Sequence, residues 1–237
     1  MWGVVGWGEW SLGGAFGMRV VWVLGAVLLA LFFWVWMTFF PETHSWRQKL
    51  TLAVETPSGE KSGASVIEAR VSFYDGGQFM SGTEVVYDLT GEAAVVEVLP
   101  GRYLFALLGG SEERFAAAAR DRFQGMTRGQ WLREIPQQTD PVVLTGELIP
   151  MLVTFDDITK PETGRKVDPE DLAAVCGEGV RLKAVTLEIT DEAVTEGRVE
   201  RVLGWLDDPR YIKNPGWAAL PVSVQDAIMG LREHPPQ

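Results

Sequence analysis

The longest uninterrupted apolar run in the chain extends over residues 20–40. Each helical residue adds 1.5 Å, so this run would span roughly 30 Å, which is the thickness of the hydrocarbon core of a bilayer. No polar face interrupts the run, and this disfavours a helix buried in a soluble core. The pattern predicts one transmembrane helix over residues 18–41.

The end of this run indicates whether the helix is removed or retained. A cleavable signal has a shorter apolar stretch, about 7 to 15 residues, followed by small residues at the cleavage site. Here Ala30 is the last small residue before the exit, and the bulky residues Leu31, Phe32, Phe33, Trp34 and Trp36 follow it. Aromatic rings favour the headgroup region and would fix the depth of the helix. We therefore expect a signal anchor that contacts the lipid bilayer through Val20 to Phe40.

The segment before the helix, residues 1–17, is Gly-rich and carries a single charge. Because Met18 stands directly before a basic residue and the apolar run, it resembles an ordinary start of a signal anchor. Met1 and Met18 are both candidates for the first residue, and residues 1–17 form an N-terminal extension that the natural protein need not contain.

The orientation of the helix rests on few charges, since Arg19 lies on one side and Arg47 and Lys49 lie on the other. Short basic starts usually remain inside. We expect a single-pass membrane protein with a cytoplasmic N-terminus and an extracytoplasmic C-terminal domain.

Beyond the anchor, the apolar residues recur with a period of two, which is typical of half-buried strands. Pro100-Gly101 separates two of these segments and favours a hairpin. In the last segment the apolar positions change phase near Ala184, which indicates a β-bulge. The predicted strands cover residues 48–55, 65–71, 85–89, 94–99, 102–108, 142–148, 151–155 and 180–190.

Helical patterns are shorter and less frequent. Ser111 is placed to cap a helix over residues 111–123, and Asp168 followed by Pro169 is typical of the start of a short helix that ends at Cys176. Apolar residues also recur at helical spacing over residues 199–206, and a last short helix is predicted within a turn-rich tail, residues 207–237. The fold class is therefore α+β. We expect one N-terminal transmembrane helix followed by a mainly antiparallel β domain over residues 46–206 with a few short helices.

The charge of the chain restricts its partners. The formal net charge is −11, and no basic patch with interleaved aromatic residues is present, so we expect no nucleic-acid binding. A single cysteine permits no internal disulfide.

An acidic segment follows the strand that ends near residue 155. It holds six acidic residues within sixteen positions, but their spacing does not match a calcium-binding EF-hand loop. Half of them suit a helix start and a solvated loop. The alternatives are a calcium site formed by Asp156, Asp157 and Asp168, and a hydrolase that uses the same carboxylates.

Familiar catalytic groups are absent from the sequence or poorly placed in it. The two histidines, His44 and His234, lie beside the predicted membrane exit and in the C-terminal tail. Neither is well placed as a general base, which excludes Ser-His-Asp and Cys-His arrangements. Cys176 lies on the apolar side of its predicted helix, where a core residue is expected rather than a nucleophile. No phosphate-binding glycine loop is present, and we expect no cofactor.

Four segments, SWRQKLTLAVETPSG, GRYLFALLGG, MLVTFDD and KVDPEDLAAVCGEGVRLKAVTLEIT, resemble an uncharacterised family of bacterial proteins with one N-terminal membrane helix. The resemblance extends over about Trp46 to Leu206. It implies a bacterial envelope protein, single-pass in the inner membrane, without implying any activity. It also implies an aromatic residue at the position of Cys176, which would make this cysteine a substitution in the core.

The sequence thus favours a membrane-anchored, extracytoplasmic binding or accessory protein whose biochemical activity is not indicated. One alternative is a subunit of a larger membrane assembly with a protein partner in the membrane or envelope. The second is the carboxylate-dependent hydrolase.

Overall fold

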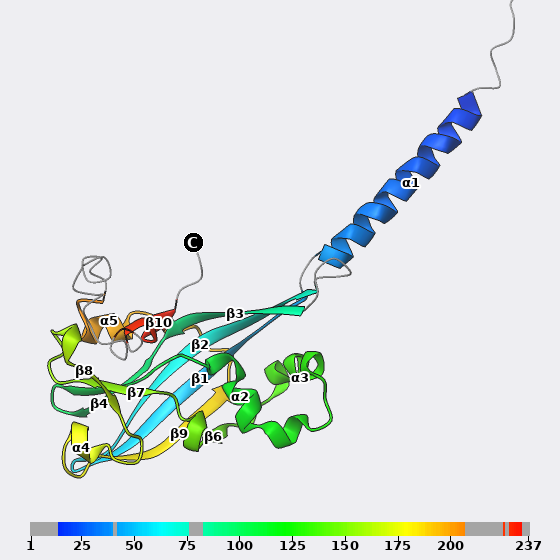
Figure 1. Ribbon diagram of the computed structural model, residues 1–237. Helices are drawn as coiled ribbons and strands as arrows, with labels where there is room; N and C mark the ends of the chain where they lie inside the picture. The colour runs from blue at the N-terminus through cyan, green and yellow to red at the C-terminus, as the bar shows by residue number, and fades with distance from the viewer. Residues whose placement is uncertain (1–13, 40–41, 76–82, 207–224, 226–227, 234–237) are drawn as a thin grey trace, which may run out of the picture. The chain divides into compact units, whose positions relative to one another are not determined.

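The computed structural model describes residues 14–39, 42–75, 83–206, 225 and 228–233 (Figure 1). The chain divides into two compact units. The first contains Met1–Glu42 and Phe73–Val85, and the second contains Thr43–Ser72 and Val86–Gln237. Each unit is described by itself.

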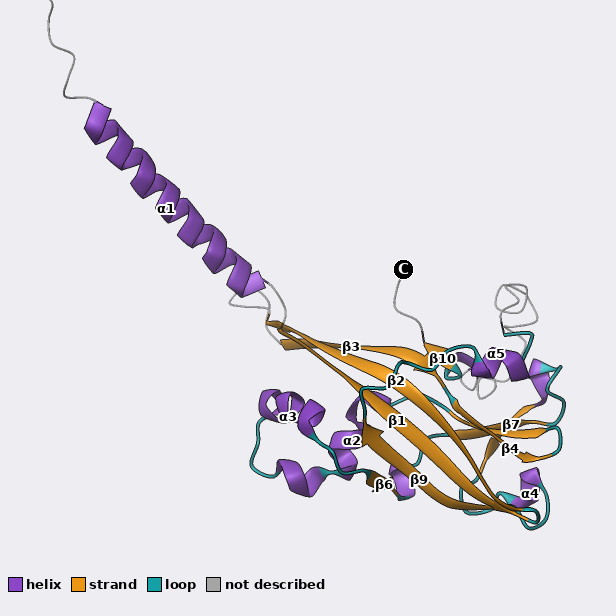
Figure 2. Cartoon of the chain, turned by 180° about the vertical axis from the view of Figure 1, so that it is seen from behind, coloured by secondary structure: helices purple, strands orange, loops and turns teal. Residues whose placement is uncertain are grey.

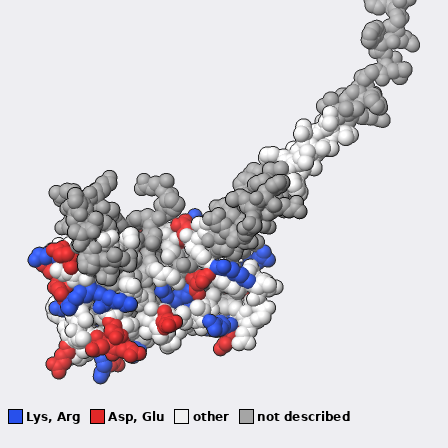
Figure 3. All heavy atoms as spheres, in the orientation of Figure 1, with Lys and Arg blue, Asp and Glu red and all other residues white. Residues whose placement is uncertain are grey.

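The first unit contains one long helix, α1 (Gly14–Phe39). Its side chains are described for residues 22–34, and they are apolar and mostly exposed around the whole helix, including Trp22, Phe33 and Trp34. No charged side chain occurs in this stretch, which is white in Figure 3. Within the described part of the chain, no helix is both long enough and apolar enough to cross a membrane. Phe40, the last residue of the apolar run, and Pro41, the last residue of the predicted helix, lie outside the described residues.

The large sheet, most of which belongs to the second unit, has the strand order β10-β3-β2-β1-β9-β6. Its central strands are long (Figure 2). The pairs β1–β9, β3–β10 and β6–β9 run antiparallel, as predicted. The strands are β1 (Glu42–Thr56), β2 (Gly59–Asp75), β3 (Thr83–Glu92), β6 (Val142–Leu144), β9 (Arg181–Ile189) and β10 (Arg232–Glu233). β1 pairs with β9 from Gln48–Ile189 to Glu55–Arg181.

The predicted bulge in the last long strand is confirmed. Ala53 pairs with Ala184, but the next residue of β1, Val54, pairs with Leu182, so Lys183 is the extra residue. An extra residue shifts the alternation of side chains by one position. The apolar residues before and after Lys183 can therefore point to the same, buried face of the sheet.

The small sheet has the order β4-β5-β7-β8 and is also antiparallel. The hairpin predicted around Pro100-Gly101 is confirmed, and Gly101 adopts a positive φ of 72° at its turn. The strands are β4 (Ala94–Leu99), β5 (Arg102–Ala106), β7 (Leu152–Phe155) and β8 (Gly164–Val167). A Cβ added to Gly63 of β2 would lie 2.0 Å from the carbonyl oxygen of Val95, so glycine allows the two sheets to touch there.

An apolar cluster joins the small sheet to the C-terminal part of the chain. Phe155 is buried between two rings, with centroids 5.7 Å from those of Phe105 and Trp205. Val199 and Leu203 from α5 (Arg198–Val202) and its exit are buried in the same cluster, together with Ile228. This confirms the apolar pattern predicted over residues 199–206.

The helical segments are shorter than predicted. The segment 111–123 forms α2 (Ser111–Ala118) and a 3₁₀ turn, η2 (Arg120–Phe123), because Ala119 leaves the α conformation. Ser111 is the first helical residue rather than the cap, and its hydroxyl donates to the carbonyl of Leu108. The expected packing on the large sheet is confirmed, since the amide of Gln48 donates to the carbonyl oxygen of Ser111 at 2.7 Å.

Two further helical segments were not predicted, and two strands are shorter than predicted. α3 (Arg128–Glu134) continues into η3 (Ile135–Gln137), and the sequence patterns predicted neither. β6 stops at Leu144 because η4 (Gly146–Leu148) follows it, and β5 stops at Ala106. Residue 225 and residues 228–229 are helical, whereas the rest of the predicted last helix lies outside the described residues.

Candidate functional site

The first two carboxylates of the acidic segment, those of Asp156 and Asp157, have partners within the protein. Asp156, directly after β7, lies 2.5 Å from the guanidinium of Arg165 and 3.9 Å from that of Arg102. Asp157 accepts hydrogen bonds from the backbone N–H of Thr159 at 3.0 Å and from its hydroxyl at 2.6 Å. Those bonds, above all the one from the hydroxyl, lower the pKa of Asp157. Both groups are therefore suited to holding the loop between β7 and η5 (Pro161–Thr163).

Asp168 lies apart from this pair, beyond β8. Its carboxylate accepts a hydrogen bond from the backbone N–H of Glu170 at 2.9 Å. Among the described residues, no group of three or more His, Cys, Asp or Glu side chains could hold a metal ion. The calcium site formed by Asp156, Asp157 and Asp168 stays a prediction that this arrangement does not favour.

The predicted helix start at Asp168 is wrong. The helix α4 begins five residues after Asp168 and spans only Ala173–Cys176. Asp168 instead closes a turn, and Asp171 is the residue whose side chain accepts from a helical N–H, that of Ala174 at 3.2 Å. The Asp168 carboxylate bonds to the N–H two residues later, in a turn, and this bond competes with helix capping. The competition explains why α4 starts later than predicted.

The end of α4 agrees with the sequence. Gly177 follows Cys176 with a φ of 121°, as expected beyond a helix terminus. Cys176 is fully buried, and burial raises the pKa of its thiol, so it fits a core position better than that of a nucleophile.

A buried carboxylate that the sequence did not indicate lies at the end of β3. Glu92 is 2% exposed and accepts hydrogen bonds from the backbone N–H groups of Arg198 at 3.0 Å and Val199 at 3.1 Å. Burial raises its pKa, the two backbone bonds lower it, and the neighbouring Glu200 carboxyl raises it further. Glu92 thereby fixes the start of α5 to the large sheet, which is a structural role.

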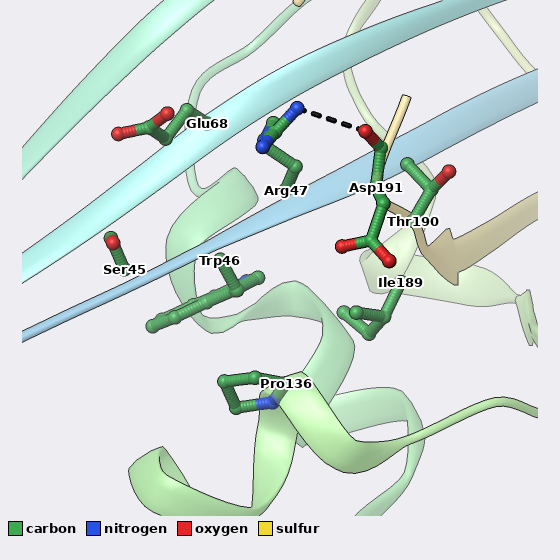
Figure 4. A pocket seen from close by; sticks show the side chains of 8 residues that line it. All are labelled: Ser45, Trp46, Arg47, Glu68, Pro136, Ile189, Thr190 and Asp191. Carbon is green, nitrogen blue, oxygen red and sulfur yellow. Dashed lines mark hydrogen bonds between the residues drawn. The ribbon is translucent and has the colours of Figure 1, made fainter. Parts of the chain in front are cut away.

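A pocket with a volume of about 190 Å³ lies where β9 leaves the large sheet (Figure 4). It contains charges of both signs beside apolar side chains. Its walls come from the start of β1, from β2, from η3 and from the end of β9. The lining residues are Ser45, Trp46, Arg47, Glu68, Pro136, Ile189, Thr190 and Asp191.

Arg47 is held in a fixed position at this pocket. One nitrogen of its guanidinium, Nη1, donates to the backbone carbonyl oxygens of Asp191 at 2.9 Å and Glu192 at 2.8 Å. Figure 4 shows the first of these bonds, with Trp46 on the opposite side of β1 beside Pro136. Trp46 is buried and donates to the side-chain carbonyl of Gln48 at 3.3 Å. A rigid frame of this kind can bind a ligand without first being ordered.

Charged pairs elsewhere on the large sheet are solvated. Lys49 contacts Glu192 at 2.6 Å and Glu188 at 3.8 Å, and Lys183 contacts Glu60 at 2.5 Å. On the face of the second unit seen in Figure 3, acidic and basic groups lie close to one another. Exposed pairs of this type contribute little to stability and do not mark a site.

No family model, curated protein or solved structure matches this chain. The resemblance to a bacterial family with an N-terminal membrane helix stays a prediction. The pocket and α1 are therefore the features that bear on function. No sequence pattern indicates the pocket, because its walls come from four separate segments.

Proposed function

We propose that this chain is a membrane-anchored binding or accessory protein of the bacterial envelope, whose α1 lies in the lipid bilayer and whose second unit works outside the cytoplasm. The apolar surface of α1 carries the proposal. Trp22 is 75% exposed, and its described neighbours through Trp34 are also mostly exposed and apolar on every side of the helix. A helix that is hydrophobic all round is stable only when other apolar groups cover it, and lipid supplies such cover.

The length of the apolar run in the sequence supports the same proposal. Residues 20–40 are sufficient for one crossing, although the side chains described in α1 cover only part of that run. The net negative charge belongs to the residues after the apolar run. It disfavours adsorption of that part of the chain on anionic lipid. The helix is thus the proposed membrane contact.

The pocket favours binding over catalysis. Arg47 is fixed by two backbone carbonyls, and the pocket lacks a histidine, cysteine or lysine side chain among its described lining residues. The hydrolase alternative has weaker support, because the lowered pKa of Asp157 disfavours a role as a general acid. The alternative of a subunit in a membrane assembly fits the same exposed helix, and a stoichiometric membrane protein that co-purifies would favour it.

Alkaline carbonate extraction tests the anchor. The full chain should stay in the membrane pellet, and a matched variant that begins at Glu42 and lacks α1 should be soluble. Release of the full chain by carbonate, or a shortened mature form that begins after Phe40, would contradict the proposal.

A further inference from the structure

The pocket lies at a place where one strand of the large sheet ends and its neighbour continues. The last paired residues of β1 and β9 are Gln48 and Ile189, and the N–H of Thr190 then donates to the carbonyl oxygen of Arg47 at 3.0 Å. β1 begins six residues before Gln48, at Glu42, and β9 is its neighbour on this side. Among the described strands, none continues the position of β9 beside the start of β1.

The direction of the backbone groups follows from strand geometry. In an antiparallel pair, the N–H and C=O of alternate residues face the same neighbour. Because the carbonyl of Arg47 faces β9, the N–H and C=O of Ser45 and Thr43 face the same side, beyond the end of β9. Both residues are exposed, and Ser45 lines the pocket. These backbone groups form an open strand edge, which is a template for another strand.

The geometry around the edge keeps this position open. The guanidinium of Arg47 binds the carbonyls of Asp191 and Glu192 and so fixes the chain where it turns away from β1. Trp46 and Pro136 form the opposite wall (Figure 4). The result is a notch beside a strand edge with a volume of about 190 Å³.

The charge and shape of the notch indicate its occupant. Among the described residues, no hydrogen bond or ion pair to the side-chain carboxylate of Asp191 is found, and the chain as a whole has a net charge of −11. A basic side chain would complement this carboxylate. A second copy of the chain fits less well than a basic partner, since two chains that each carry a net charge of −11 repel each other.

We propose that the notch binds an extended, basic segment of a partner protein, which adds to the edge of β1 as a strand in the position that β9 leaves vacant. The inference rests on the proposed function of the chain as a binding protein and names the class of its ligand. Backbone hydrogen bonds to Ser45 supply the part of the affinity that does not depend on the sequence of the segment. The notch supplies the specificity, because it contacts the side chains of the segment. Asp191 contacts a lysine or arginine of the segment.

The test uses the full chain in lipid nanodiscs and a random library of twelve-residue peptides displayed on phage. Peptides rich in lysine or arginine should be enriched over empty nanodiscs. The decisive variant is Ser45→Pro, which removes the N–H that faces the notch, and edge strands tolerate proline. Its binding of the selected peptides should be at least tenfold weaker than that of the parent.

A matched control exists on another edge of the same sheet. The register across β1, β9 and β6 indicates that the backbone groups of Val142 and Leu144 bond to β9. The N–H of Val143, which lies between them, therefore points away from β9, towards the open edge of β6. Val143→Pro should bind the peptides as the parent does. Asp191→Asn should reduce the preference for basic peptides without abolishing binding, because the backbone contacts remain.

Two results would overturn the inference. One is the absence of any peptide enriched over empty nanodiscs. The other is equal binding by Ser45→Pro and the parent. If Ser45→Pro melts earlier than Val143→Pro, methylation of the backbone nitrogens of a selected peptide gives the same test from the ligand side, and unchanged binding then contradicts strand addition. Failure of the anchor would appear separately, as release of the chain by carbonate.

Discussion

Phe155 provides a direct test of how the second unit is held together. Its ring is almost completely buried and lies edge-on to both Phe105 and Trp205, at 5.7 Å from each ring. Replacing a buried phenylalanine with alanine costs about 3 to 5 kcal/mol, through lost burial and the cavity left behind. Because the ring of Phe155 contacts two other rings, we expect a loss of at least the middle of this range, about 4 kcal/mol.

Urea unfolding of a fragment that begins at Glu42 measures this loss. With a slope of about 2 kcal/mol per molar urea, Phe155→Ala should lower the unfolding midpoint by roughly 2 M. Near-ultraviolet circular dichroism should change as well, because the ring beside Trp205 is lost. Met229→Ala is the control, since Met229 is exposed in the same region and should change the free energy of unfolding by less than about 0.5 kcal/mol.

A loss below about 1 kcal/mol for Phe155→Ala would refute this reasoning. It would mean that the C-terminal segment does not pack on the small sheet through Phe155, or that the site collapses almost without cost. Equal effects of Phe155→Ala and Met229→Ala would lead to the same conclusion.

The remaining predictions concern charged groups. Burial raises the pKa of Glu92 above its ordinary value of 4.5, so its contribution to stability is complete below pH 4.5 and is lost as the pH rises through the folded-state pKa. Urea titrations should show that the parent loses stability relative to Glu92→Gln across this window, and a pH-independent difference would contradict the burial. Asp171→Ala should lower the free energy of unfolding by about 1 kcal/mol through the lost bond to α4, and Asp171→Asn should be nearly neutral. Millimolar calcium should leave the melting temperature unchanged, whereas a rise abolished by Asp156→Asn and Asp157→Asn would establish the calcium site.

Local sequence patterns predicted much of the second unit. The hairpin of β4 and β5 has strong alternation and a Pro-Gly turn, and the bulge beside Ala184 appears in the sequence as a phase change. Both features depend on neighbours in the chain. α3 went unpredicted although it has a readable start, since the side chain of Gln130 accepts from the N–H of Thr127 at 2.8 Å in a capping box.

The candidate site depends on contacts between distant segments, which no local pattern encodes. Glu92 binds N–H groups more than one hundred positions away, and its burial cannot be read from its neighbours. The notch exists because β9 stops at Ile189 while β1 continues, and the register of those two strands is set by long-range pairing. In the sequence, Arg47 bears only on the orientation of the predicted membrane helix. In the structure it holds the segment that follows β9, through the backbone carbonyls of Asp191 and Glu192.

Labelling of a single exposed cysteine tests the proposed placement of the chain in the membrane. Val143→Cys creates a thiol at a position that is 61% exposed, whereas the native Cys176 is fully buried and should not react. In intact spheroplasts, a membrane-impermeant maleimide should label Val143→Cys and should leave the parent unlabelled. The labelled chain should then stay in the carbonate-washed pellet. Labelling that requires lysis of the spheroplasts, or a labelled chain in the soluble fraction, would contradict this placement.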